Sequence, residues 1–538
     1  MKRGVTAVIL LLLAGIAGAR EFGWVQVDPL SYTYSTSNLR SSVAVNASGE
    51  PARARMVHDT DDGSADLGVY RIDRYDVTGT LLWSVQLQGS VVVNGLKFAP
   101  DGALFCWGRY VDTLRVAPDH FLVAGDGSLH DFLLSLTADH QVSWLRDGRD
   151  IDPAVSSLRA LDVDAAGRIW IGVRYNSLDT AVLRLGPDGA TQSVYPQESV
   201  RDVSGITVDP DGTAWAVGTT FAGPVSFNGT AAVAPFTYSK YVVKYLPEGT
   251  VHWVRFVEDV TFSDLVVAGD GTGHIYFAGP LSADFPFGDL TPEGPDWVYD
   301  FFLTRLDAAG NFLWLREVPA DGLTGDAGNG KGACIASADS TGVTFVGFFR
   351  GSIDWGGGVV PPNQGGADVL VLRYDSDGAF SWVKTAGGPE NDTADAVAVA
   401  PQGTVYLAGQ VAAGATFDGV AYSSSPVNTF IASLPPEGAT GVVPRDPAAL
   451  ALTCFPNPFN PRTRIAFRLA APAEVNVAIF DLCGARVADL ASGWRPAGEQ
   501  VVFWNGRDQA GRPAASGRYL CRVTAGGATG AIPLVLVR

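Results

Sequence analysis

The chain has 538 residues, of which 47% are hydrophobic and only 17% are charged, and it contains 63 glycines and 32 prolines. This composition is typical of a protein built from strands and turns, and it argues against a helical or disordered chain. The formal net charge of −18 argues against binding to nucleic acid or to an anionic membrane, because both would be repelled.

The N-terminus has the pattern of a secretory signal peptide. Lys2 and Arg3 precede the apolar run "GVTAVILLLLAGIAG", which closes on the small residues 17–19. This run and every later apolar run are shorter than the roughly 20 residues that a membrane-spanning helix needs. We therefore expect residues 1–19 to be a signal peptide and the mature protein to be exported, soluble and free of transmembrane segments.

One phrase recurs along the chain and defines a repeat. The copies "RYDVTGTLLWSVQL", "RLDAAGNFLWLREV" and "RYDSDGAFSWVKTA" share Arg, Asp, Gly and Trp at fixed spacing. Two degraded copies begin at Ser135 and Lys244, and two more, at Arg184 and Ser433, keep the turn glycine but lose the Trp. Seven copies result, at intervals of about 45–70 residues, which is a period typical of solenoids and propellers.

A second hairpin precedes the repeat phrases, as in "GITVDPDGTAWAVG". Together the two hairpins predict a four-stranded antiparallel meander, because the turn glycines allow the positive φ that tight hairpins need. One such sheet is too small to bury both of its faces, so neighbouring sheets must stack. The sequence therefore predicts an all-β fold in which residues 20–440 form a seven-bladed β-propeller, with six or eight blades as alternatives.

The mature N-terminus carries a Trp strand, "FGWVQV" at residues 22–27, without a repeat in front of it. The seventh repeat copy lacks a Trp strand. We therefore predict that strand 22–27 completes the last blade and removes the exposed edge of an open ring. The repeat predicts equivalent packing between blades for Trp24, Trp83, Trp144, Trp253, Trp314 and Trp382.

The repeat stops at a Pro/Ala-rich linker, residues 441–450, and residues 451–538 alternate as the strands of a small Ig-like β-sandwich. The motifs "PNPFNP" at 456–461, "FDLCGARV" at 480–487 and "WNGRDQAGRPAASGRY" at 504–519 occur there in order. With these motifs the domain resembles the Ig-like domain of flagellar hook-capping proteins and the type A C-terminal sorting domain of the type IX secretion system. The resemblance implies export through the outer-membrane machinery as a partner and attachment at the cell surface. A purely structural Ig-like module is the alternative.

No catalytic, cofactor-binding or metal-binding set is predicted from the sequence, and no cofactor is expected. The segment "GDAGNGKG" at 325–332 has phosphate-loop spacing but lacks the hydroxyl residue after its Lys, and "DTDDGSAD" at 59–66 has its Gly too early for a calcium loop. The six histidines show no metal-ligand spacing. Asp179, Asp300 and Asp368 each stand five residues before a repeat Arg, which predicts a scaffold role repeated in several blades.

The function predicted first is an exported, non-catalytic propeller whose loop face binds a glycan, protein or peptide. Four aromatic residues in the loops between second and third strands are candidates for ligand contact, with capping of the ring as the alternative: Phe285, Phe287, Trp297 and Trp355. The repeat phrase also resembles the tryptophan-docking repeats of quinone-dependent dehydrogenase propellers. A secreted hydrolase, lyase or quinoprotein with its site at the central mouth is therefore the rival hypothesis, and a structural cell-envelope protein is the third.

Overall fold

The structure, a computed structural model, is all-β apart from one helical turn within the residues that it describes. These residues are 21–30, 41–59, 67–176, 178–258, 265–281, 285–292, 300–319, 325–330, 332–337, 339–356, 358–421, 427–436, 452–457, 459–469, 473–480, 486–496, 498–509, 511–525 and 528–537. The expected signal peptide and linker lie outside them and stay predictions. A search of these residues finds no helix with the length and apolar character to cross a membrane.

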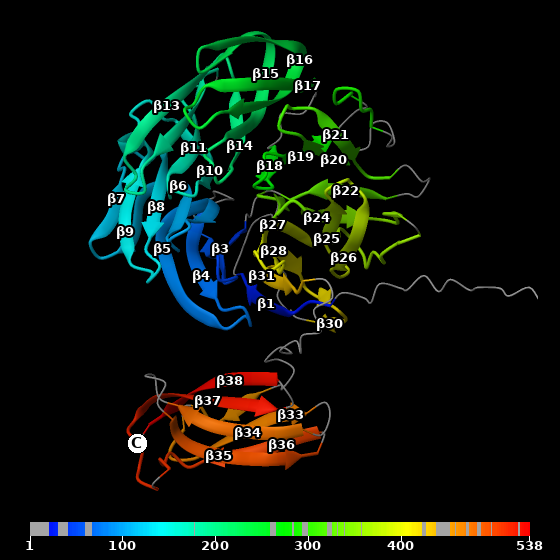
Figure 1. Ribbon diagram of the computed structural model, residues 1–538. Helices are drawn as coiled ribbons and strands as arrows, with labels where there is room; N and C mark the ends of the chain where they lie inside the picture. Colours follow the sequence, from blue (N-terminus) through cyan, green and yellow to red (C-terminus); the bar gives the residue numbers. More distant parts are fainter. Residues whose placement is uncertain are drawn as a thin grey trace, which may run out of the picture.

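Five antiparallel β-sheets of the propeller, two of them eight-stranded, stand around a common centre, and each eight-stranded sheet divides into two blades, which gives blades 1 to 7 (Figure 1). Blades 1 and 2 share one long strand, which is the outer strand of blade 1 in its first part and the inner strand of blade 2 in its last part. The strands of these two blades are β2 (Ser42–Val45), β3 (Pro51–Asp59), β4 (Gly68–Tyr75), β5 (Leu81–Phe98), β6 (Leu104–Ala117), β7 (His120–Val123), β8 (Leu129–Leu136) and β9 (Val142–Asp147).

The helical turn α1 (Gly148–Ile151) leads from blade 2 to blades 3 and 4, which are joined at their outer ends by a short pairing of Gln197 with Phe227. Their strands are β10 (Ser157–Val163), β11 (Ile169–Arg174), β12 (Thr180–Leu185), β13 (Thr191–Glu198), β14 (Asp202–Val208), β15 (Ala214–Phe227), β16 (Thr230–Tyr245) and β17 (Val251–Glu258).

Blades 5 and 6 follow, and the inner strand of blade 6 is split into two pieces that both pair with the same neighbour. Their strands are β18 (Val266–Gly269), β19 (Ile275–Leu281), β20 (Asp300–Leu306), β21 (Phe312–Arg316), β22 (Asp326–Asn329), β23 (Ile335–Ala336), β24 (Gly342–Arg350), β25 (Asp368–Asp375) and β26 (Phe380–Ala386).

Blade 7 closes the ring with a strand from the start of the chain. Its strands are β27 (Thr393–Val399), β28 (Val405–Ala412), β31 (Val427–Leu434) and β1 (Trp24–Pro29), with a small hairpin of β29 (Thr416–Phe417) and β30 (Val420–Ala421) beside them. Strand β1 pairs antiparallel with β31, so that Trp24 lies opposite Ser433 and Val27 opposite Phe430. The innermost strands contact one another around the ring, and β27 contacts β2, so the seven blades form a closed propeller.

The recurring turn explains why the repeat phrase forms a hairpin. In the turn of blade 5, Gly310 has φ +81°, and its N–H donates to the carbonyl of Asp307 at 3.0 Å. The Asp307 carboxylate accepts from the N–H groups of Ala309 and Asn311, both at 2.9 Å. Asp therefore stabilises the turn and Gly allows its left-handed residue, which is the reason both recur.

The repeat tryptophans dock onto the turn of the following blade. The turn glycine allows this approach, because a Cβ on Gly310 would come within 2.9 Å of the Trp253 ring. In blade 3, which lacks the Trp, Tyr195 packs against Gly249 instead. The indole N–H groups donate to backbone oxygens across the blade boundary: Trp24 to Val77 at 3.1 Å, Trp144 to Pro187 at 3.1 Å, Trp253 to Ala308 at 3.0 Å and Trp314 to Ser376 at 3.0 Å.

Residues from 453 onward form a separate Ig-like sandwich of two sheets. The strands are β32 (Thr453–Phe455), β33 (Thr463–Leu469) and β36 (Gly498–Trp504) in one sheet, and β34 (Ala473–Phe480), β35 (Arg486–Arg495), β37 (Gly517–Ala525) and β38 (Ala528–Leu536) in the other. Alternate residues such as Ile465, Phe467, Val475 and Val477 meet in its core. The observed architecture confirms the predicted propeller followed by a small sandwich.

Candidate functional site

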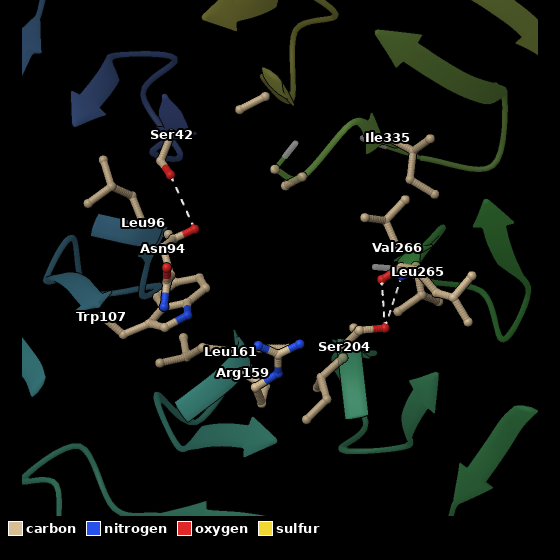
Figure 2. Close-up of a pocket in the computed structure, with 18 of the residues that line it drawn as sticks. Ser42, Asn94, Leu96, Trp107, Arg159, Leu161, Ser204, Leu265, Val266 and Ile335 are labelled. Carbon is tan, nitrogen blue, oxygen red and sulfur yellow. Dashed lines mark hydrogen bonds between the residues drawn. The ribbon is translucent and has the colours of Figure 1, made fainter. Parts of the chain in front are cut away.

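The inner strands of the propeller enclose a cavity of about 150 Å³ at the centre of the ring. Every blade contributes to its wall, from Ser42 on blade 1 to Ala396 on blade 7. In Figure 2, Asn94 and Trp107 lie across the cavity from Leu265, Val266 and Ile335, and the guanidinium of Arg159 lies between the two groups. Polar groups therefore lie on the side of Asn94 and Trp107, called here the polar side although Leu96 and Leu161 also lie there, and the opposite side is apolar.

Arg159 is held at the wall by a carboxylate of the next blade. Its Nε donates to Oδ1 of Asp202 at 2.9 Å and its Nη2 donates to Oδ2 at 2.8 Å. This two-point geometry matches the fork of the guanidinium to the carboxylate and fixes the plane of the Arg159 head group. Asp202 does not line the cavity, so the cation faces the cavity while its partner lies behind it.

A second arginine, Arg109, also contributes to the cavity wall. Asp131 on β8 lies within electrostatic range of both arginines and accepts the Leu158 N–H at 2.9 Å. Burial raises the pKa of Asp131 to about 6, against the opposing effects of the Leu158 hydrogen bond and the two cationic charges. Both arginines are thus presented to the cavity with carboxylates outside its wall.

Trp107 brings an unsatisfied hydrogen-bond donor to the polar side. Its ring covers Gly95, where a Cβ would come within 2.0 Å of the indole, so only glycine permits this packing. Trp107 is 8% exposed, and its buried Nε1 has no hydrogen-bond partner in the part of the chain that the structure describes. A buried donor without a partner costs about 1–3 kcal/mol, so its position at a cavity wall indicates a ligand or water partner.

The apolar side comes from blades 5 and 6. Its one neighbouring hydroxyl, that of Ser204, is already engaged, since it accepts the Leu265 N–H at 3.0 Å and donates to the Leu265 carbonyl at 3.1 Å. Leu265, Val266 and Ile335 therefore offer methyl groups to the cavity, opposite the arginine and indole donors. Such a wall suits a ligand with one polar end and one apolar end.

Of the four aromatic residues predicted to contact a ligand, the three that the structure describes do not line this cavity. Phe287 is 1% exposed and packs against Phe302, with ring centroids 4.8 Å apart. Trp355 is 3% exposed and stacks near Phe301 at 6.3 Å, while Phe285 is half-buried and Trp297 lies outside the described residues. Burial favours the packing alternative over ligand contact for Phe287 and Trp355, because neither ring has an accessible face.

The recurring carboxylates accept hydrogen bonds from nearby backbone or side-chain groups, as a scaffold role requires. Asp300 accepts from the Val318 N–H at 3.0 Å, Asp179 from the Ser199 N–H at 3.1 Å, and Asp368 from the Asn363 side-chain amide at 2.9 Å. The segment with phosphate-loop spacing contains strand β22 rather than a loop before a helix, and its Lys331 lies outside the described residues. Most of the acidic segment 59–66 also lies outside them.

The structure also brings together a cluster of hydrogen-bonded side chains that was not predicted from the sequence, because no motif marks it. The Ser128 hydroxyl lies 3.1 Å from His130 Nε2, and His130 Nδ1 lies 3.2 Å from the Asp147 carboxylate. Asp126, however, lies 2.7 Å from the Ser128 hydroxyl and 3.2 Å from His130 Nε2. The Ser128 hydroxyl donates its proton to the Asp126 carboxylate, so this cluster holds the turn at residues 126–130 together.

The C-terminal sandwich has a recognisable relationship to known proteins. Residues 457–529 match the FlgD Ig-like domain family. The chain is also similar to NHL repeat-containing protein 3, with 30% identity to the Mus musculus protein and 29% to the Homo sapiens protein over 120 residues. These matches cover 22% of this chain and 32% of each relative, so the chain spans about a third of the length of the curated relatives it matches.

The solved structures to which the chain is similar have low sequence identity to it. PorZ, a surface component of the type-IX secretion system of Porphyromonas gingivalis, is 12% identical with a TM-score of 0.26, over 93% of this chain and 70% of PorZ. Aldose sugar dehydrogenase from Streptomyces coelicolor, in its PQQ-bound form, is 12% identical with a TM-score of 0.27, over 77% and 98%. The α-L-arabinofuranosidase Arb93A from Fusarium graminearum is 8% identical with a TM-score of 0.33, over 75% and 95%. The fold assignment rests on the strand pairing described above.

Proposed function

We propose that the protein is an exported binding protein that holds a small molecule in the central cavity of its propeller. The observation that carries this proposal is the polarity of the cavity wall, with Arg159 and the unpartnered indole N–H of Trp107 opposite Leu265 and Ile335. Guanidinium, indole and methyl groups orient and desolvate a ligand. The described lining residues include neither a carboxylate nor a histidine, the groups that general acid–base chemistry most often uses, so the wall supports binding better than catalysis.

A neutral probe tests whether the cavity binds at all. The uncharged compound 3-methylbutanamide has a branched apolar body and a polar end, and we expect calorimetry to detect its binding to the full chain. Replacing Ala160 at the wall by Phe fills the cavity, so Ala160→Phe should abolish this binding while the circular dichroism spectrum stays unchanged. A folded Ala160→Phe variant that binds the amide as well as the parent protein would contradict a central site.

We further propose that the C-terminal sandwich directs export by the type IX machinery and attachment at the outer cell surface. The signal-peptide pattern of residues 1–19, the three ordered motifs and the family match at 457–529 support this role. Fractionation of cells should find the full chain at the surface and a chain ending at residue 450 retained inside the outer membrane. The cavity variant Ala160→Phe is the matched control and should reach the surface, and equal surface delivery of the shortened chain would overturn the sorting role.

A further inference from the structure

We propose that the ligand of the central cavity is a small monocarboxylate with a compact apolar body. The carboxylate lies against the guanidinium of Arg159 and the indole N–H of Trp107, and the apolar body lies against Leu265, Val266 and Ile335. This inference rests on the proposed binding function and specifies the ligand class of the same site.

The charge of the wall selects an anion. The whole chain carries a formal net charge of −18, yet among the residues that the structure describes the ionisable side chains that line the cavity are Arg109 and Arg159. The carboxylates that balance them, Asp202 and Asp131, do not line the cavity. An anion in the cavity therefore meets cationic groups at closest range and carboxylates only beyond them, and the attraction between charges is greatest at close range.

The donors select a carboxylate. A guanidinium presents N–H groups in a plane that matches the two oxygens of a carboxylate. The Asp202 pairing already fixes the plane of Arg159, so its head group is ordered before a ligand arrives. Trp107 adds a buried N–H without a partner, and a carboxylate oxygen at that point would satisfy it and recover the cost of the unmatched donor.

The size and the opposite wall select a compact apolar body. A cavity of about 150 Å³ admits a small molecule only. A polar group placed against Leu265, Val266 or Ile335 would meet methyl groups and no hydrogen-bond donor from those side chains, so the part of the ligand that faces blades 5 and 6 is apolar. A branched chain of a few carbon atoms fills this side and removes apolar surface from water.

Calorimetry with the full chain at pH 7 tests the ligand class. The probes are 3-methylbutanoate, its uncharged amide and inorganic phosphate. We expect the acid to bind at least tenfold more tightly than the amide, and phosphate to bind more weakly than the acid. Arg159→Lys keeps a cation beside Asp202 but loses the planar fork, and Trp107→Phe keeps a ring over Gly95 but loses the N–H, so each should weaken acid binding about fivefold. Amide binding should weaken less, because its uncharged oxygen forms weaker hydrogen bonds with these donors than a carboxylate does.

Matched controls come from outside the cavity. Arg115→Lys changes an exposed arginine, and Trp494→Phe changes a tryptophan of the sandwich that is 73% exposed, so both should bind the acid like the parent protein. Equal binding of acid and amide, or tighter binding of phosphate than of the acid, would overturn the carboxylate proposal and leave cavity binding standing. Absence of binding by all three probes would overturn both proposals, and cavity variants with unchanged acid binding would overturn the residue assignment.

Discussion

The indole Nε1 of Trp253 in blade 4 donates a 3.0 Å hydrogen bond to the backbone oxygen of Ala308 in blade 5. Arg255, two residues along the same strand, donates from its Nε to the carbonyl of Gly310 at 2.9 Å and stacks over the Trp253 ring. Trp314 and Arg316 repeat both bonds onto the next turn, at Ser376 and Gly378. The repeat phrase therefore encodes a strand, a turn and the junction to the neighbouring blade.

Truncation of one docking tryptophan should loosen one blade boundary. We expect Trp253→Ala to lower the free energy of unfolding by about 3–5 kcal/mol, because it leaves a cavity between blades 4 and 5. Trp253→Phe should cost less, since it retains much of the packing and loses mainly one hydrogen bond. Urea unfolding followed by circular dichroism measures both, and the exposed Trp494→Ala should leave the propeller transition unchanged.

Substitution of the turn glycine should separate backbone strain from steric conflict. Gly310→Ala forces a side chain into φ +81° and places its Cβ within 2.9 Å of the Trp253 indole, so we expect a loss of about 2–4 kcal/mol. Gly229→Ala is the matched control, since Gly229 has φ +78° but nothing within 4 Å of its Cβ position. Equal losses in the two variants, measured by thermal unfolding, would show that the docking contact is not tight.

The ring closure should depend on an ion pair between β1 and blade 1. Asp28 accepts hydrogen bonds from Arg53, which is fully buried, and from Arg55 at 3.2 Å, while Asp73 holds Arg55 from the other side at 3.1 Å. Asp28→Asn removes a carboxylate that pairs with the buried guanidinium groups, so we expect the free energy of unfolding to fall by about 2–4 kcal/mol. Limited proteolysis should then release the N-terminal strand sooner, and Asp139→Asn on the surface should show no change.

Stability should fall as the pH rises from about 4 to 8. Burial raises the pKa of Asp300 to about 8, and the charges of Glu317 and Asp326 add to this rise while backbone bonds from Phe301 and Val318 oppose it. Because its unfolded value is near 3.8, the folded protein retains a proton in this window that the unfolded chain has lost, and deprotonation costs up to a few kcal/mol. Burial also raises the pKa of Asp131, Asp209 and Asp392 within this window, so Asp300→Asn should reduce the slope of the urea midpoint against pH without abolishing it. An unchanged slope would show that Asp300 does not contribute.

Binding of 3-methylbutanoate should tighten as the pH falls from 8 to 5.5. The pKa of Asp131 is about 6, so protonation in this range removes a negative charge near Arg109 and Arg159 while the ligand stays ionised. We expect a gain of about three- to tenfold in affinity, allowing for the screening of charges in the protein. Asp131→Asn can still accept the Leu158 N–H and should bind with the higher affinity at pH 8 without the pH dependence.

The repeat architecture could be predicted from the sequence, because the residues that determine it lie close together in the chain. The turn needs Asp and Gly within four residues, the strands need alternating apolar residues, and each docking tryptophan stands at a fixed distance from its own turn. The unpartnered Trp strand at residues 22–27 predicted the closing strand, and β1 pairs with β31 accordingly. Two contacts were harder to predict from the sequence: Tyr195 takes the place of a docking Trp, and His140 stacks on Trp83. Neither residue matches the repeat phrase, and only the fold shows that each occupies the position of a motif residue.

The candidate site depends on long-range packing, and no motif of residue types marks it in the sequence. Ser42 and Ala396 line the same cavity although more than 350 positions separate them. The lining residues of blades 2 to 5 stand at the same distance before a turn glycine, but their residue types differ from blade to blade. Loop aromatics were plausible contacts by their position, yet the tertiary structure buries Phe287 and Trp355 between strands. Local residue chemistry was sufficient for strands, turns and blade junctions, whereas the cavity exists only after seven blades close into a ring and bring distant side chains to one centre.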